Sequence, residues 1–216
     1  MNRIATGLAG GAILLLTTLG GCPGPANPGG GGTVNTAGGV LTGGGTGGAG
    51  AGATDVLAER YPGCTEAVEG NAWRDEVLRL VNEARRREGV AALTWNPLLE
   101  AQATAYACEM IHYDFFSHNN PATGSSLADR VNEFGYQYWT VGENLAAGQR
   151  TPAEVVQAWL ESPCHKENIL NPAFTELGVG VRFGGDYGVY WVQEFGRPFS
   201  AGPYTGPVLH VPGCAH

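Results

Sequence analysis

The sequence predicts an α+β fold in which helices cover an antiparallel sheet. Three observations support this prediction. Through most of the region after residue 55, apolar residues recur at the spacing of amphipathic helices. Near the carboxyl end, β-branched and aromatic runs replace that spacing, with a glycine-rich turn between them. No apolar run in this region approaches the roughly 18 residues that a membrane-spanning helix needs.

Four helices are expected from the apolar spacing and from residues that start or stop a helix. Their approximate bounds are 73–88, 97–115, 125–134 and 152–161. Pro97 and Pro152 fall in the first turn, where proline is tolerated, and Thr151 can cap the last of these helices. Gly89 and Gly135 stand where the chain is expected to leave a helix.

Two strands are expected at Leu177–Phe183 and Val189–Phe195, because both runs are rich in β-branched and aromatic residues. The segment Gly184–Gly188 separates them and has the composition of a hairpin turn. Helices first and a hairpin last favour an antiparallel sheet that helices cover.

The amino-terminal quarter differs in composition from the rest of the chain. Between Arg3 and Asp55 there is no charged residue, and 19 of the 35 glycines precede Thr54. Arg3 gives a positive start, and Ile4–Leu19 is an uncharged, mostly apolar run that glycines interrupt. This run is short for a membrane span, so residues 1–21 are predicted to be an export signal peptide.

The signal ends in Leu19-Gly20-Gly21-Cys22, which resembles the lipobox of bacterial lipoproteins. In that motif a peptidase cleaves before the cysteine, whose sulfur carries a diacylglycerol. Cys22 is therefore expected to be lipidated and to anchor the protein to a membrane; an ordinary secretory peptide is the alternative. Pro23 is compatible with sorting to an outer membrane. We expect a lipid-anchored location at the cell envelope or surface, on the extracellular or periplasmic face.

Residues 22–54 are expected to be the lipidated cysteine and a disordered tether. Fourteen of the 31 residues from Pro23 to Ala53 are glycine, so the segment cannot bury enough surface to offset its ordering entropy. As a coil, its r.m.s. reach is about 30 Å. Residues 55–216 form the predicted globular domain. The chain has a net charge of -8, which argues against a nucleic-acid partner.

The cysteines predict two disulfides. If Cys22 is lipidated, four cysteines remain, and an even set in an exported protein favours pairing. Three connectivities are open. We expect Cys64–Cys214, which bracket the domain, and Cys108–Cys164, which lie inside it. The alternative is that Cys164, which is adjacent to a histidine, is a thiolate nucleophile.

Three polar motifs stand out in the domain. They are Phe116-Ser117-His118, Val141-Gly142-Glu143-Asn144-Leu145-Ala146, and the segment Ser162–Val181 that begins Ser-Pro-Cys-His. In this order and spacing they resemble the CAP superfamily, also called SCP-like proteins, which includes cysteine-rich secretory, antigen-five and pathogenesis-related proteins. The resemblance covers about Trp73 to Arg197. It implies an α/β/α sandwich, in agreement with the expected helices and hairpin.

The resemblance also implies a shallow cavity that gathers two histidines and two acidic residues. His118 and His165 match the histidines, and Glu143 matches the glutamate of the Gly-Glu-Asn strand. The position of the second acid falls on Ser162 here, so we expect Asp129, from another helix, to substitute for it. The alternative for each residue is a local role, such as holding a loop or capping a turn.

Two imidazoles and a carboxylate could hold Zn²⁺ or another divalent metal and leave one position open, as in catalytic zinc sites. His118, His165 and Glu143 are thus the candidate metal ligands. They come from three separate segments rather than from a His-Glu-x-x-His helix, so their spacing alone does not establish a site.

Two functions are open to such a domain. The first is a binding module for a lipid, glycan or protein at the cell envelope, because the family includes lipid and sterol binders. The second is a metal-assisted hydrolase of peptide or cell-wall material, with Glu143 as ligand or general base. We expect the binding module, since no nucleophile–base pair is recognisable. Tyr136, Tyr138 and Trp139 could rim an apolar groove, although core packing is the simpler expectation.

Overall fold

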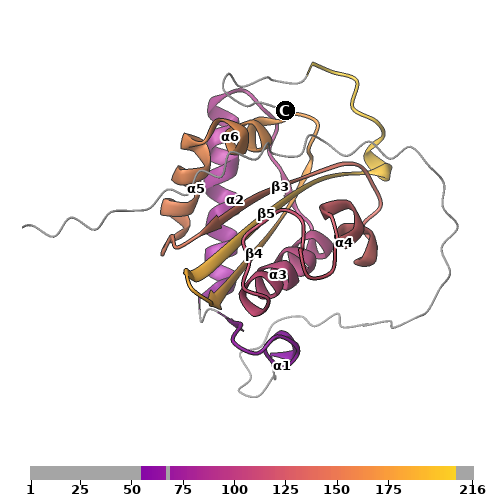
Figure 1. Ribbon diagram of the computed structural model, residues 1–216. Helices are drawn as coiled ribbons and strands as arrows, with labels where there is room; N and C mark the ends of the chain where they lie inside the picture. Colours follow the sequence, from indigo (N-terminus) through magenta and orange to yellow (C-terminus); the bar gives the residue numbers. More distant parts are fainter. Residues whose placement is uncertain (1–54, 67–68, 208–216) are drawn as a thin grey trace, which may run out of the picture.

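In the part of the chain that the structure describes, six α-helices pack around one β-sheet (Figure 1). The structure is a computed structural model that describes residues 55–66 and 69–207. The predicted signal peptide, Cys22, the tether and Cys214 lie outside these residues. The helices are α1 (Val56–Arg60), α2 (Gly70–Arg87), α3 (Pro97–His112), α4 (Leu127–Glu133), α5 (Pro152–Glu161) and α6 (Pro163–Leu170). The strands are β1 (Thr65–Glu66), β2 (Thr94–Trp95), β3 (Tyr138–Ala147), β4 (Glu176–Gly184) and β5 (Gly188–Pro198).

The three long strands form the centre of the sheet, whose order is β1-β4-β5-β3. β4 and β5 are the predicted hairpin, and β3 pairs antiparallel with β5. The short β2 pairs with β4 in parallel, at Thr94 and Trp95, so the sheet is not wholly antiparallel as predicted. The predicted fold class, a mainly antiparallel sheet covered by helices, is confirmed.

Helices cover both faces of the sheet. α2, α5 and α6 lie on one face, and α3 and α4 lie on the other (Figure 1). Side chains of a strand point alternately to the two faces, and β5 follows this rule. Val189, Trp191 and Phe195 join the core on the α2 and α5 side, whereas Tyr190 and Val192 join the core under α3.

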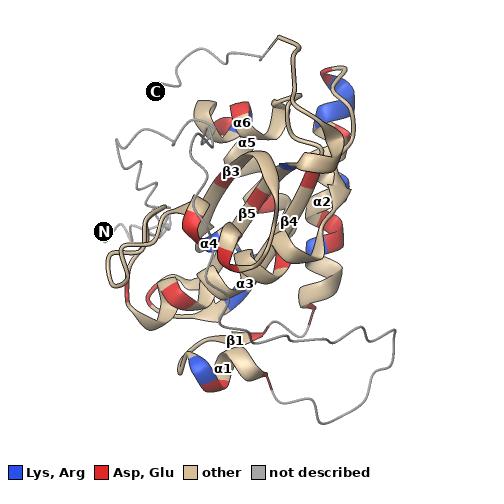
Figure 2. Ribbon diagram, turned by 90° about the vertical axis from the view of Figure 1, so that its right-hand side faces the viewer, with Lys and Arg blue, Asp and Glu red and all other residues tan. Residues whose placement is uncertain are grey.

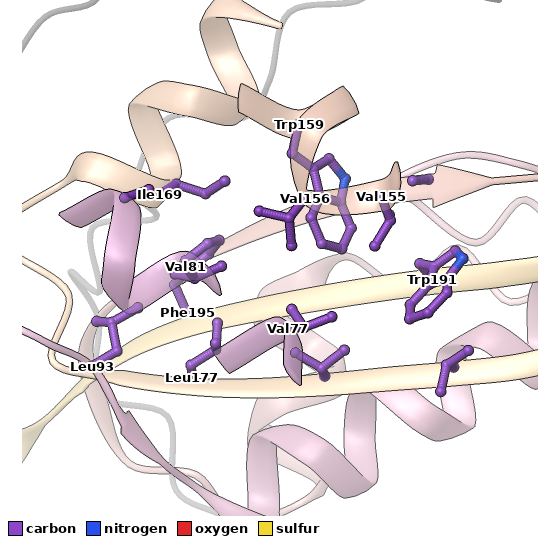
Figure 3. Packing of buried hydrophobic residues seen from close by; sticks show 14 of the residues in the cluster. Val77, Val81, Leu93, Val155, Val156, Trp159, Ile169, Leu177, Trp191 and Phe195 are labelled. Carbon is purple, nitrogen blue, oxygen red and sulfur yellow. The ribbon is translucent and has the colours of Figure 1, made fainter. Parts of the chain in front are cut away.

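The larger core lies between the sheet and the helices α2, α5 and α6 (Figure 3). Its largest side chains are Trp159 of α5 and Trp191 of β5, which are 1% and 0% exposed. Trp159 Nε1 donates to Leu145 O at 3.1 Å, and Trp191 Nε1 donates to Gln149 O at 2.8 Å. Both buried indoles therefore have the hydrogen-bond partner that burial demands.

α3 lies very close to the sheet because two glycines of β4 face it. A Cβ atom at Gly178 would overlap the backbone of Glu100, and one at Gly180 would overlap the backbone of Ala103. Glycine in a strand permits such a close approach of another backbone. The approach brings polar side chains of α3 within reach of the middle of the sheet.

The helix termini follow the expected signals, with one difference. The side chain of Asn96 caps α3, and the side chain of Thr151 caps α5. α3 ends at His112 rather than near Phe115, and Asp114 turns the chain away with a positive φ of 53°. No helix in the described part of the chain combines the length and apolar content that crossing a membrane requires.

The cysteine pairing differs from the prediction. Cys64 is joined to Cys108, with Cα atoms 5.3 Å apart, so the expected pairs Cys64–Cys214 and Cys108–Cys164 are both wrong. The position of the cysteines relative to the sheet explains why Cys108 does not pair with Cys164. Cys108 lies on α3 and is buried with Cys64 in the core on that face, whereas Cys164 lies on α6, on the other face. Cys164 is itself disulfide-bonded, so it is not a thiolate nucleophile.

Candidate functional site

A buried ion pair forms the base of the site. Arg130 of α4 and Glu143 of β3 are 3% and 1% exposed, and Arg130 Nη2 lies 2.7 Å from Glu143 Oε2. Arg130 Nη1 donates to His118 O at 2.9 Å. The ring of Tyr106 lies against the guanidinium, with its centroid 3.4 Å from Cζ. A buried ion pair needs such additional contacts to offset its desolvation, and here they also fix the backbone at His118.

His118 lies between the ion pair and solvent. Its Nδ1 is 2.8 Å from Glu143 Oε1, and its side chain is 25% exposed. When Nδ1 carries a proton, the imidazole donates to the carboxylate and Nε2 is left as the second polar atom of the ring. The neighbouring backbone is held by Tyr106 Oη, which donates to Ser117 O at 2.6 Å. Of the two carboxylate oxygens of Glu143, Oε1 thus pairs with His118 and Oε2 pairs with Arg130.

A second buried carboxyl group, that of Glu194 in β5, lies opposite Glu143. The two residues are partners in the β3–β5 register, which places their Cβ atoms about 5 Å apart on one face of the sheet. In Figure 2, acidic positions, in red, appear within the strands at the middle of the sheet. Burial, and then the Glu143 carboxylate, raise the pKa of Glu194 well above its usual value.

Gln102 of α3 connects Glu194 to the ion pair. In the amide orientation that satisfies its neighbours, the nitrogen of Gln102 donates to the Glu194 carboxyl group. Its oxygen then accepts from Arg130 Nε at 3.1 Å. Gln102 is 1% exposed and Glu194 is fully buried. Glu143 thus pairs directly with the Arg130 guanidinium, whereas Glu194 is connected to it through Gln102 of α3, which the close approach of α3 to β4 brings within reach.

His165 reaches the site from α6, beside the edge strand β3. Asn144 Nδ2 donates to His165 O at 3.0 Å. Asn168 Nδ2 donates to Glu143 O at 3.2 Å and to Asn144 Oδ1 at 2.9 Å, so side-chain amides fasten α6 to β3. Burial, and then the nearby His118, lower the pKa of His165 to about 4. His165 is therefore neutral at pH 7, and it lies in the same region as His118 and Glu143.

Comparison with known proteins places this sequence in a family. The sequence pattern of the cysteine-rich secretory protein family, CAP, matches residues 78–195, more than half of the chain. The chain belongs to the CAP family. YkwD, an uncharacterized protein of Bacillus subtilis strain 168, is 40% identical to this CAP protein over 125 residues, 58% of this chain and 47% of YkwD.

A second relative and two solved structures agree with this assignment. YlbC, an uncharacterized membrane protein of the same strain, is 32% identical over 123 residues, 54% of this chain and 35% of YlbC. The CAP protein thus matches less than half of the length of either relative. An extracellular protein of Bacillus anthracis strain Ames that contains an SCP domain is 31% identical, with a TM-score of 0.53, over 59% of this chain and 41% of that chain. An outer surface protein of Borrelia burgdorferi is 25% identical, also with a TM-score of 0.53, over 57% of this chain and 91% of that chain.

Asp129, the fourth residue expected at the site of this CAP domain, makes local contacts. Its Oδ2 accepts from Ser126 N at 2.9 Å and from Ser126 Oγ at 2.6 Å, which completes a capping box at the start of α4. These hydrogen bonds lower the pKa of Asp129, and the residue is exposed. Glu194 is the acid that faces Glu143, and sequence reasoning missed both Glu194 and Arg130.

The geometry of the CAP site does not fit a resident metal ion. Zn²⁺ would need lone pairs from His118, His165 and Glu143. Both oxygens of Glu143 already accept from Arg130 and His118, and a guanidinium at this distance repels a cation. Across residues 55–66 and 69–207, no three His, Cys, Asp or Glu side chains are arranged to hold a metal. The arrangement supports no metal-dependent step.

The aromatic residues before Glu143 do not form a rim together. Tyr136 and Tyr138 are 2% and 5% exposed and belong to the core, with their rings stacked 6.1 Å apart. Trp139 is 40% exposed and packs edge-on against Phe199, with centroids 5.2 Å apart. Core packing therefore accounts for the two tyrosines of this CAP domain.

Proposed function

We propose that this protein is an exported, membrane-anchored CAP protein whose site around His118 binds a lipid, glycan or protein ligand at the cell envelope. Two solved relatives support export, since one is described as extracellular and the other as an outer surface protein. The segment Leu19-Gly20-Gly21-Cys22 supports the anchor, because it resembles a lipobox. Residues 22–54 would then be the tether, with a reach of about 30 Å.

The observation that carries the binding role is that Glu143 is already satisfied. Arg130 neutralises this carboxylate and His118 takes its second oxygen, so the buried charges need no further partner. The imidazole edge of His118 remains accessible beside the neutral His165. An imidazole can both donate and accept, which suits a hydroxyl, amide or ester group of a ligand.

A nucleophilic enzyme finds less support in this geometry. Such an enzyme needs a hydroxyl or thiol within hydrogen-bond reach of its base. Among residues 55–66 and 69–207, no Ser or Thr side chain is hydrogen-bonded to the ring of His118 or His165. Cys164 is disulfide-bonded, so it offers no free thiol.

A hydrolase acting on peptide or cell-wall material is the second candidate. The hydrogen bond between Glu143 and His118 favours it, because a carboxylate that orients an imidazole is the arrangement of a general base. In this role His118 Nε2 would take a proton from water, and the Glu143 carboxylate would stabilise the imidazolium. This version needs no metal ligand.

Matched variants of the full-length protein separate the two candidates. His118→Gln removes the imidazole but keeps a polar side chain, and His112→Gln changes an exposed histidine at the end of α3 as a control. Molecules that co-purify from the envelope are extracted and identified by mass spectrometry. A molecule present with wild type and His112→Gln but lost with His118→Gln supports binding, whereas equal recovery from all three contradicts it. Cleavage of peptide or cell-wall fragments that Glu143→Gln abolishes would support the hydrolase instead.

The membrane anchor is tested separately with Cys22→Ser. Wild-type protein should partition with membranes and carry an acyl mass on Cys22. Cys22→Ser should appear in the soluble fraction, since it lacks the sulfur that carries the lipid. Equal association of both proteins with membranes would contradict lipidation.

A further inference from the structure

The charges of the groups around His118 balance one another. The guanidinium of Arg130 and the carboxylate of Glu143 form one buried ion pair, 2.7 Å apart. Burial, and then that carboxylate, raise the pKa of Glu194 well above its usual value, which favours its neutral acid form. Burial, and then the nearby His118, lower the pKa of His165 to about 4, so its ring is neutral at pH 7. These groups therefore leave no excess negative charge that would hold a second proton on the His118 ring.

The place of the proton on a neutral His118 follows from its contact with Glu143. Nδ1 lies 2.8 Å from Glu143 Oε1, a distance at which one of the two atoms donates to the other. Because Glu143 is the anion of an ion pair with Arg130, its oxygen accepts and Nδ1 donates. A neutral imidazole carries one N–H. Nε2 of the neutral ring therefore holds a lone pair and no proton.

The surrounding contacts keep the ring from presenting another edge. Turning the ring over would place a carbon atom against Glu143 Oε1, and a buried carboxylate oxygen would lose its donor. The backbone is held at two successive carbonyl groups, since Tyr106 Oη donates to Ser117 O at 2.6 Å and Arg130 Nη1 donates to His118 O at 2.9 Å. The fold thus fixes both the position of His118 and the nitrogen that carries its proton.

Nε2 is the polar atom of His118 that stays available to a ligand. It makes no hydrogen bond within residues 55–66 and 69–207, and it is not buried. The side chain as a whole is only 25% exposed, so a donor group with few substituents reaches this nitrogen most easily. The site therefore offers an incoming ligand one partly covered hydrogen-bond acceptor.

We propose that the site around His118 binds an uncharged ligand through a hydroxyl group, which donates its proton to Nε2. The oxygen of an ether, ester or ketone has no proton to give, and its lone pairs would face the lone pair of Nε2. An ammonium group would need a negative charge that the balanced site does not offer. A hydroxyl has one substituent, whereas a backbone amide N–H lies between two, so the hydroxyl better suits a histidine that is mostly covered.

This inference rests on the ligand-binding role proposed above and narrows it to one chemistry. Sugar rings and partial glycerides both present uncharged hydroxyl groups, and the donor to Nε2 is the same in either case. The two sources differ in what the rest of the ligand contacts, so the experiment below treats them separately.

The position of the proton is tested first, because that measurement needs no ligand. Full-length protein with ¹⁵N-labelled histidine is studied by NMR in detergent micelles at about pH 8, above the ordinary imidazole pKa of about 6.5. Correlations between ring nitrogens and ring C–H protons distinguish a protonated nitrogen from a bare one. His118→Gln identifies the His118 resonances by removing them, and His112→Gln, which changes the exposed histidine at the end of α3, is the matched control. Nδ1 of His118 should be protonated and Nε2 bare, and a proton on Nε2 would overturn the inference.

The ligand class is tested with two pairs of probes that differ in their hydroxyl groups. Methyl glucoside is compared with its fully O-methylated form, and dihexanoylglycerol is compared with its methyl ether. The affinity of each probe is measured by saturation-transfer NMR titration, and the Nε2 resonance of wild type is followed in parallel. At least one hydroxyl-bearing probe should bind about tenfold or more tightly than its methylated partner, as expected when a buried acceptor gains its donor. That probe should shift the Nε2 resonance, and the pair that responds identifies the source as sugar or glyceride.

Binding of the responding probe should be lost in His118→Gln and retained in His112→Gln. Equal affinities within both pairs, no binding of either hydroxyl-bearing probe, or unchanged binding in His118→Gln would each overturn the proposal. These failures differ from a failure of the binding role itself, in which molecules from the envelope would be recovered equally from wild type and His118→Gln.

Discussion

Replacing Arg85 by leucine should destabilise the protein by about 4 kcal/mol. Arg85 of α2 is fully buried, and its guanidinium donates only to backbone carbonyl oxygens among the contacts of the described residues. The acceptors are Ala91 O at 2.6 Å, Ile169 O at 2.8 Å, Asn171 O at 3.0 Å and Phe174 O at 3.2 Å. Burial lowers the pKa of Arg85 to about 10, so the cation persists at pH 7.

The size of the expected loss in stability follows from the carbonyl groups that would have no hydrogen-bond donor after the substitution. Each buried acceptor without a donor costs about 1–3 kcal/mol, so the three buried carbonyl groups of Ile169, Asn171 and Phe174 would cost about 3–9 kcal/mol. Ala91 is exposed, so water can replace the donor that its carbonyl loses. Removing a buried charge returns part of its desolvation cost, which keeps the net loss near the lower end. The freed carbonyl groups lie mostly at 169–174, directly after the turn of α6 that carries His165, so this segment should also become more mobile.

Urea denaturation followed by tryptophan fluorescence measures the free energy of unfolding, with the disulfides kept oxidised. Arg86→Leu is the control, because Arg86 is the next residue of α2 and is exposed; it should change the stability by less than about 0.5 kcal/mol. A loss below about 1 kcal/mol for Arg85→Leu would refute the view that this guanidinium holds the segment after α6.

Four further predictions follow from packing, charge and cysteine pairing. Gly180→Val should lower the thermal midpoint sharply, because its side chain would overlap the backbone of α3; an unchanged midpoint would contradict the close packing. As the pH falls from 6.5 toward 4, wild type should lose up to about 3 kcal/mol relative to His165→Gln, because the lowered pKa of His165 makes the unfolded state bind the extra proton. Glu194 acts with the opposite sign, since its raised pKa makes the stability of wild type fall as the pH rises. The stability of Glu194→Gln should therefore rise relative to that of wild type above about pH 4.5. Urea midpoints at several pH values test both predictions, and plots of midpoint against pH that run parallel for wild type and variant would contradict them. Peptide mapping without reduction should find Cys164 in a disulfide, and an alkylatable Cys164 would contradict this.

Local signals explain which helices could be predicted from the sequence. Asn96 and Thr151 are capping residues that act within a few positions of the chain, and the structure uses both as caps. The helix α6 was not predicted, although Ser162 and Pro163 offer the same kind of start signal as Thr151 and Pro152, because the segment that follows is short and polar and shows no apolar periodicity. Its buried residues Ile169 and Leu170, together with amide contacts to β3, stabilise it. Such tertiary contacts leave no periodic trace in a short helix.

The candidate site likewise contains residues that the sequence predicted and residues that only the fold brings together. His118, Glu143 and His165 could be named from motifs, whereas Arg130 and Glu194 become neighbours only through the register of β3 with β5 and the packing of α4. One signal was present, because Glu194 is the acidic residue of a mostly apolar strand. A buried carboxyl group requires a partner, but the sequence does not say which residue provides it.

The alternation of β5 ties the packing of the apolar core to the buried polar cluster around Glu143. Trp191 faces the large apolar core and Glu194 faces Glu143, and only the odd or even position in the strand separates them. Inserting or deleting one residue between them would place both side chains on the same face of the sheet, so either the carboxyl group of Glu194 would enter the apolar core or the indole of Trp191 would enter the polar cluster. The spacing of three positions between Trp191 and Glu194 is therefore a requirement of the fold, which the loops at either end of the strand do not share.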